Sequence, residues 1–161
     1  MSWQTDAVAL IRTQVQDLDY NNYTYTDDRL EEVFIVAAYN IINDVSFNTS
    51  YVVNITNSTI SPDPVSDTYF MSLTALKASC LILFSEYKTA GSNSIMVTDG
   101  PSTINYSGVA KELKEMWKHC LDQYDQLKLK YSIGEGSSGQ AILTPYSPGS
   151  NFYNYRGRLC R

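Results

Sequence analysis

The sequence predicts a mainly α-helical fold, namely a four-helix bundle with two short β-hairpins and an extended C-terminal arm. Three observations lead to this prediction. Apolar residues recur at spacings of three and four in four segments, which is the period of an amphipathic helix. Two other segments combine β-branched residues with turn residues. Glycine, serine and proline interrupt the end of the chain. We therefore expect a helical-bundle domain over residues 1–133 and an arm over residues 134–161.

The first two helices are expected over residues 3–17 and from residues 26–28 onward. Acidic residues favour the positive end of a helix dipole, and Glu31 follows Asp28 in capping-box register, which supports the second start. The predicted core residues are Val8, Ile11, Val15 and Leu18 in the first helix, and Leu30, Val33, Phe34, Ala37, Ile41 and Val45 in the second.

A first hairpin is expected between Tyr51 and Ile60, where β-branched residues flank a tight turn at Asn57-Ser58. Asp67 is expected to cap a third helix that runs to about Lys88 and is apolar over much of its circumference, as the central helix of a bundle would be. Its predicted inward residues are Phe70, Leu73, Leu76, Cys80, Leu81 and Phe84.

A second hairpin is expected around Asp99-Gly100, with Pro101 making its loop longer than two residues. Ser107 is then expected to cap a fourth helix of about 25 residues, which Gly134 ends. The predicted inward positions of this helix are Val109, Leu113, Met116, Cys120, Tyr124, Leu127 and Tyr131.

The arm differs in charge from the rest of the chain. The net charge is −5, and the arm holds three arginines and one glutamate, so it carries +2 and residues 1–133 carry −7. Fully extended, the arm would reach on the order of 90 Å. Aromatic and arginine side chains are enriched where proteins bind one another, so we expect the arm to bind a partner. The expected binding residues are Tyr146, Phe152, Tyr153, Tyr155, Arg156, Arg158 and Arg161.

Catalytic chemistry is not expected. His119 and Cys120 are adjacent on a helix, so their side chains point about 100° apart and do not form a nucleophilic pair. The paired carboxylates lie at helix starts or on solvated faces, and the Gly134–Gly139 region lacks the lysine of a phosphate loop. The acidic domain offers no basic face for nucleic acid. We expect no enzyme activity, no cofactor and no metal.

The chain is also expected to lie outside membranes, because no apolar run approaches 18 residues and the N-terminus lacks the features of a signal peptide. Three widely separated cysteines, Cys80, Cys120 and Cys160, are expected to be free thiols rather than a disulfide or metal set.

Three local sequences resemble head-to-tail connector proteins (adaptor or neck proteins) of tailed bacteriophages. They are Thr-Ile-Ser-Pro-Asp-Pro at residues 59–64, Leu-Lys-Ala-Ser-Cys at 76–80 and Val-Thr-Asp-Gly-Pro-Ser-Thr-Ile-Asn at 97–105, which leads into a long helix. The resemblance covers about residues 26–133.

This resemblance implies a structural virion protein, made in the host cytoplasm, that assembles as a homo-oligomeric ring, expected to be a dodecamer. The ring would lie below the portal and above the next neck or tail protein, and double-stranded DNA would pass through it without sequence specificity. The arm would dock on the portal. The hairpins would contact neighbours through Tyr51, Val53, Ile55, Asp99, Gly100 and Ile104.

Two other functions remain open from the sequence. The chain could be a small helical protein-binding or regulatory module, whose fourth helix presents a face to its target. It could also be another neck component, such as a head-closure or tail-completion protein, although such proteins are usually dominated by β-structure.

Overall fold

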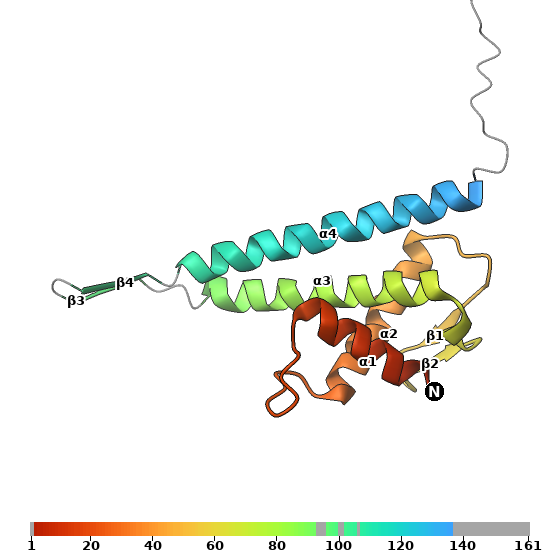
Figure 1. Cartoon of the computed structure of the whole chain (residues 1–161), viewed down its shortest axis with the longest axis horizontal. Helices are drawn as coiled ribbons and strands as arrows, with labels where there is room; N and C mark the ends of the chain where they lie inside the picture. The colour runs from red at the N-terminus through yellow and green to blue at the C-terminus, as the bar shows by residue number, and fades with distance from the viewer. Residues whose placement is uncertain (1, 93–95, 100–101, 106, 137–161) are drawn as a thin grey trace, which may run out of the picture. The chain divides into compact units, whose positions relative to one another are not determined.

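The structure is a computed structural model, and it describes residues 2–92, 96–99, 102–105 and 107–136. The described residues form four α-helices and two antiparallel hairpins, so the predicted mainly helical fold is confirmed (Figure 1). The chain divides into two units, Met1–Leu129 and Lys130–Arg161, and the division falls inside the last helix, α4 (Ser107–Gly136). The core and both hairpins belong to the first unit.

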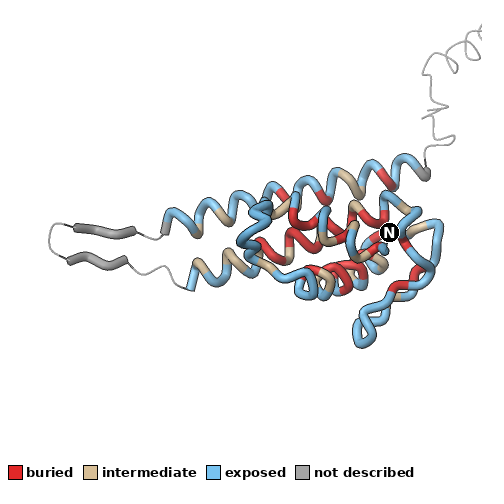
Figure 2. The backbone as a smooth tube through the Cα atoms, turned by 60° about the horizontal axis from the view of Figure 1, so that its bottom comes forward, coloured by how far each residue is buried: buried red, intermediate tan, exposed pale blue. Residues whose placement is uncertain are grey.

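The central element of the core is α3 (Thr68–Ser92), as the sequence predicts. Its start is fixed by Asp67, whose carboxylate accepts the backbone N–H of Phe70 at 2.9 Å. Buried side chains occur around much of this helix, and the buried backbone segments gather where α3 meets the N-terminal helices (Figure 2). They are Phe70, Met71, Leu73, Thr74, Ala75, Ala78, Ser79, Cys80, Ile82 and Leu83.

The second helix, α2 (Asp27–Asp44), packs most of its predicted apolar stripe into this core. Its N-cap is Thr26, whose hydroxyl accepts the backbone N–H of Arg29 at 3.4 Å. The predicted capping box of Asp28 and Glu31 is therefore wrong, because Asp28 already lies inside the first helical turn. The fully buried residues of α2 are Leu30, Phe34, Ala37, Ala38 and Ile41, with Ile35 beside them.

The first helix, α1 (Trp3–Val15), is shorter than predicted. It ends because Gln16 adopts a left-handed backbone conformation with φ of 61°. Leu18 therefore lies beyond the helix and is 64% exposed, so its predicted place in the core is wrong. The buried face instead begins with Trp3, whose ring stacks on Phe34 with centroids 5.5 Å apart.

A buried arginine connects α1 to α2. The Nη1 atom of Arg12 lies 2.6 Å from Asp17, and its Nη2 atom donates to the Tyr25 carbonyl at 2.8 Å and to Asp27 at 2.6 Å. The guanidinium also lies 3.6 Å from the centroid of the Tyr23 ring, which is a cation–π geometry. A single side chain thus fixes both ends of the connection between the two helices.

The carboxylate of Asp17 completes this cluster. It accepts the backbone N–H of Thr24 at 2.8 Å and that of Tyr25 at 3.3 Å, in addition to the ion pair with Arg12. Both side chains of this ion pair are less than a tenth exposed. Burying two charges is tolerated here because the charges are paired and hydrogen-bonded.

The first hairpin consists of β1 (Val52–Asn54) and β2 (Thr59–Ser61), paired antiparallel. Its turn covers four residues, 55–58, rather than the two-residue turn predicted at Asn57-Ser58. The base of the hairpin is attached to α3, because the Tyr51 ring packs against Phe70 with centroids 4.0 Å apart and its hydroxyl donates to Asp67 at 2.9 Å. A short 3-10 helix, η1 (Pro64–Ser66), then leads into α3.

The second hairpin consists of β3 (Met96–Asp99) and β4 (Ser102–Asn105). Asp99 pairs with Ser102, so two residues separate the paired positions. The prediction of a longer loop is therefore wrong. In sequence order the hairpin lies between α3 and α4, the two longest helices among the described residues.

The last helix, α4, is 30 residues long and continues through Gly134 to Gly136. Gly134 was predicted to end it, and that prediction is wrong. One glycine inside a helix costs only about 1 kcal/mol, and no proline follows until Pro145.

Within the first unit α4 runs antiparallel to α3. Trp117 packs on Phe84 with ring centroids 5.0 Å apart, and one turn later the Cys120 thiol donates to the Leu76 carbonyl at 3.6 Å. Residues further along α4 therefore contact residues that lie closer to the N-terminus of α3.

We expect Arg12→Met to lower the free energy of unfolding by about 3–5 kcal/mol, because it leaves the buried Asp17 carboxylate without its counter-charge. The matched control is Arg29→Met, which removes an ion pair with Glu32 in which both side chains are 64% exposed. That change should cost about 1 kcal/mol or less. Urea unfolding followed by circular dichroism measures both, and equal losses in the two variants would contradict the role assigned to Arg12.

Candidate partner-binding surfaces

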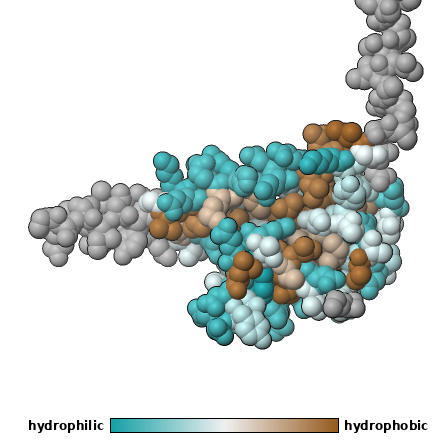
Figure 3. Space-filling view, viewed as in Figure 1, coloured by the Kyte–Doolittle hydropathy of each residue, from teal (hydrophilic) through white to brown (hydrophobic). Residues whose placement is uncertain are grey.

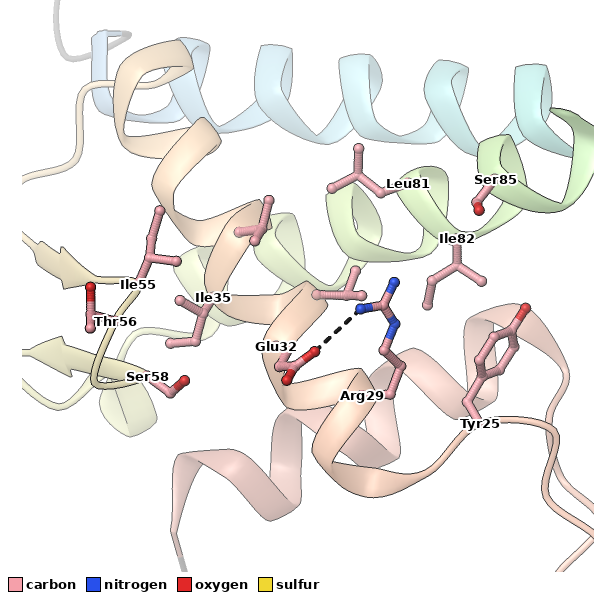
Figure 4. Close-up of a pocket in the computed structure, with 12 residues that line it drawn as sticks. Tyr25, Arg29, Glu32, Ile35, Ile55, Thr56, Ser58, Leu81, Ile82 and Ser85 are labelled. Atoms are coloured by element: carbon pink, nitrogen blue, oxygen red, sulfur yellow. Dashed lines mark hydrogen bonds and ion pairs between the residues drawn. The ribbon is translucent and has the colours of Figure 1, made fainter.

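An apolar groove lies between α2, α3 and the turn of the first hairpin (Figure 4). Its volume is about 550 Å³. Six apolar side chains line it, together with polar side chains at its edges. The apolar residues are Val33, Ile35, Val36, Ile55, Leu81 and Ile82, and the polar ones are Tyr25, Arg29, Glu32, Thr56, Ser58 and Ser85. The groove exists because the hairpin, anchored at its base, brings its turn to the side of α2.

Two apolar side chains of this groove face water to a large extent. Val36 on α2 is 41% exposed, and Ile55 in the hairpin turn is 49% exposed. At the edge, Arg29 forms an ion pair with Glu32 at 3.2 Å, drawn as the dashed line in Figure 4. The two charges cancel locally, so the groove presents exposed apolar surface with a polar rim, which is the composition of a protein-binding site.

A second hollow of about 470 Å³ adjoins the groove, since both are lined by Tyr25 and Ser85. Its other lining residues are Glu86, Thr89 and Ala90 of α3 and Leu113 of α4. Tyr25 is held between the two hollows because its hydroxyl donates to Glu86. Burial, reinforced by the Glu86 carboxylate, raises the pKa of Tyr25, so this tyrosine remains a hydrogen-bond donor.

The first half of α4 carries an apolar ridge that the core does not cover. Val109 is 53% exposed and Met116 is 41% exposed, whereas Cys120 and Tyr124 of the same predicted stripe are buried. The prediction that the first two face the core is therefore wrong. Beyond Leu83 no described residue of α3 is buried, so there is no core opposite this part of α4.

The hydropathy of the molecular surface shows where apolar side chains of the described residues reach water. Most of the visible outer face of α4 is hydrophilic, and hydrophobic surface follows the boundary between α4 and α3 (Figure 3). We call Val109, Leu113 and Met116 the α4 ridge. These residues lie on one helix face, because they are separated by four and three positions.

An aromatic cluster that sequence reasoning missed holds the outer halves of α3 and α4 together. The ring of Trp117 stacks on Tyr87 with centroids 6.3 Å apart and an interplanar angle of 6°, in addition to its contact with Phe84. Lys88 lies over the Phe84 ring at 4.5 Å. The sequence signal was a tryptophan one position away from the predicted stripe, where a large ring can reach the neighbouring helix.

The structure separates the sequence-predicted binding residues into three groups. In the first hairpin, Ile55 lines the groove, Val53 is partly buried against the core, and Tyr51 is 9% exposed and supports the hairpin from inside. In the second hairpin, Asp99 pairs with Ser102 and Ile104 pairs with Val97. Gly100 and the arm residues Tyr146, Phe152, Tyr153, Tyr155, Arg156, Arg158 and Arg161 lie outside the described residues.

The described cysteines are Cys80 and Cys120, which are free thiols buried between α3 and α4. A hydrogen bond with Cys120, together with burial, raises the pKa of the Cys80 thiol and keeps it protonated. His119 is exposed, and its Nε2 atom lies 3.1 Å from the Gln123 amide nitrogen. Among residues 2–92 and the later described segments, no group of three His, Cys, Asp or Glu side chains is placed to hold a metal ion.

One described helix is long and apolar enough to cross a membrane by length and composition. It is α3, which contains an 18-residue stretch with mean hydropathy 1.3. However, 56% of that stretch is buried inside the protein, and the core helix of a globular fold has the same composition.

Comparison with known proteins gave no match: no protein-family model, no curated protein and no solved structure matches this chain significantly.

We expect Trp117→Ala to loosen the outer halves of α3 and α4. The lost ring contacts should lower the free energy of unfolding by about 1–3 kcal/mol, less than for a fully buried ring. Amide hydrogen exchange should accelerate in residues 84–92 and 108–117 and remain unchanged in α2. Lys118→Ala, at the adjacent exposed position, is the control. Unchanged exchange in the Trp117 variant would show that the aromatic cluster does not hold these helices.

Proposed function

We propose that this protein is a head-to-tail connector (adaptor) of a tailed bacteriophage, a structural virion protein that forms a ring below the portal and joins the capsid to the tail. One observation carries this proposal. The sequence at residues 97–105, which resembles connector proteins, forms a β-hairpin inserted between the two long helices α3 and α4. The two other resembling sequences fall at β2 and η1 and in the middle of α3.

We also propose a division of labour within the chain. The four helices act as a bundle that serves as a rigid scaffold, and residues 134–161 act as the arm that docks on the portal. An arm that docks on the portal adds contact area only when the portal is present, which suits an assembly step that must wait for a filled capsid. The aromatic and arginine residues of the arm are the expected contacts.

The negative net charge of the chain is compatible with a subunit that lines a channel for DNA. Residues 1–133 carry −7, as derived above from the whole-chain charge of −5 and the arm charge of +2. Negative charge along a channel repels phosphate and does not hold the DNA back. The downstream neck or tail protein would meet the ring on the side opposite the portal.

The second candidate is a helical protein-binding module, which the apolar groove beside Val36 and Ile55 favours. A module of this kind would bind its target as a monomer or dimer and would have no affinity for a portal. A head-closure or tail-completion protein is less favoured, because the described residues are mainly helical.

We expect a chain that ends at Gly136 to keep its helical structure but to lose portal binding. This cut retains all of α4 and removes only residues 137–161. Circular dichroism reports the fold, and co-sedimentation with purified portal protein reports binding, with the full-length chain as the control. If the shortened chain binds the portal as tightly as the full chain, the docking role of the arm is wrong.

A further inference from the structure

We propose that Cys80 and Cys120 form a redox site, in which a peroxide joins the two thiols in a disulfide that attaches α4 covalently to α3. The free thiols of this structure are the reduced form of the pair. This inference uses neither the arm nor the hairpin contacts, and it does not depend on the proposed connector function.

The two sulfur atoms lie together between the helices. Cys80 is 3% exposed and Cys120 is 7% exposed, and they share a small core cluster with Leu83. The Cys80 thiol donates to the Cys120 sulfur, and the Cys120 thiol donates to the Leu76 carbonyl at 3.6 Å. A side chain as short as cysteine reaches a main-chain oxygen of the facing helix only where the two backbones come close. A disulfide, with sulfur atoms about 2.0 Å apart, therefore requires only a small local approach of the helices.

Contacts on both sides of the pair hold α4 in register with α3. One turn before the cysteine of α4, Trp117 packs on Phe84 with ring centroids 5.0 Å apart. One turn after it, the Tyr124 hydroxyl donates to Asp44 at 3.2 Å, and the Nζ atom of Lys77 lies 4.7 Å from the centroid of the Tyr124 ring. These contacts keep the two thiols facing each other, so the disulfide can form without ordering any further part of the chain.

The hydrogen bond between the thiols assigns a role to each cysteine. The bond that Cys80 donates lowers the pKa of Cys120, although burial acts in the opposite direction. Cys120 is therefore the thiol that loses its proton and attacks the oxidant, because the thiolate is the reactive form. Cys80 keeps its proton until the second step.

The oxidation proceeds in two steps. The Cys120 thiolate attacks one oxygen of hydrogen peroxide, the O–O bond breaks, and a sulfenic acid and a hydroxide ion result. The Cys80 sulfur then attacks the sulfenic sulfur, the S–S bond forms, and the hydroxyl group leaves as water with the Cys80 proton. The hydroxide ion takes up the proton that Cys120 lost. The two thiols thus lose two electrons and two protons, and the peroxide becomes two water molecules.

Burial of the pair selects the oxidant. Hydrogen peroxide is close to water in size and can reach thiols that have almost no exposed surface, whereas a bulky disulfide such as oxidised glutathione requires an exposed thiol. The reducing systems of a cytoplasm keep such a pair as thiols, so the disulfide is expected where peroxide is present and these systems are absent.

The disulfide would change how α4 is held. It closes a loop over residues 80–120 that contains the second hairpin and the first turns of α4. Closing such a loop restricts the unfolded chain, and α4 can then separate from α3 only if a covalent bond breaks. The site would convert a contact made by side chains into one that only a reductant releases.

Peptide mapping of the full-length protein tests the site. The protein is treated with hydrogen peroxide, its remaining thiols are blocked with N-ethylmaleimide, and it is digested with trypsin without reductant. The three cysteines fall on separate tryptic peptides, residues 78–88, 119–128 and 159–161. Peptide 78–88 linked to peptide 119–128 within single chains should be at least tenfold more abundant than any linkage to peptide 159–161. Linkage mainly through Cys160, linkage between copies, or oxidation without any disulfide overturns the proposal.

Two matched variants test what the bond does. Cys160→Ser should form the bond as the full chain does, whereas Cys120→Ser keeps a side chain of similar size but cannot form it. Peroxide should raise the Tm of the full chain and of Cys160→Ser by at least about 5 °C, and dithiothreitol should reverse the rise. Cys120→Ser should show no rise. An equal rise in Cys120→Ser, or a bond that forms without raising the Tm of Cys160→Ser, overturns the inference that this disulfide fixes α4.

Discussion

The buried guanidinium of Arg12 is the interaction on which the arrangement of the other elements depends. It fixes the connection between α1 and α2 through Asp17 and Asp27, and it sets the position of Tyr25 by binding that residue's carbonyl. Tyr25 then reaches α3 through Glu86 and separates the two hollows beside α3. One wall residue of the candidate binding groove, Tyr25, is therefore positioned by a charged residue inside the domain.

The packing of α4 leaves apolar side chains in its first half exposed to water. Only part of α4 lies against the core, where Tyr124 donates to Asp44 at 3.2 Å and Cys120 is buried beside Leu83. The first turns of α4 are instead held by the outer half of α3, where Trp117 packs on Phe84 and Tyr87. A helix that extends past its own core keeps apolar residues such as Val109 and Met116 in water.

Much of the fold could be predicted because helix periodicity depends only on local sequence. Most residues of the two predicted central stripes are buried, namely Leu30, Phe34, Ala37 and Ile41 of α2 and Phe70, Leu73 and Cys80 of α3. The predicted stripe residues Val33, Leu76, Leu81 and Phe84 are only half-buried. Arg12 could not be predicted, since a single arginine in an amphipathic pattern reads as a solvated residue, and its burial depends on acids that are separated from it along the chain. Val109 and Met116 show the other limit: periodicity identifies the apolar face of a helix but not which molecule covers it. Of the predicted contacts in the first hairpin, Ile55 lines the groove from the turn, whereas Val53 packs against the core and Tyr51 is buried at the base of the hairpin. These differences depend on how the hairpin attaches to α3, which local sequence does not determine.

The proposed connector function requires this chain to form a ring that joins a portal through its arm. Electron microscopy of the purified full-length protein mixed with a candidate portal protein is the most direct test. A connector should appear as closed rings of additional density stacked on one end of the portal. Portal particles without added density, beside free chains that form no ring, would contradict it.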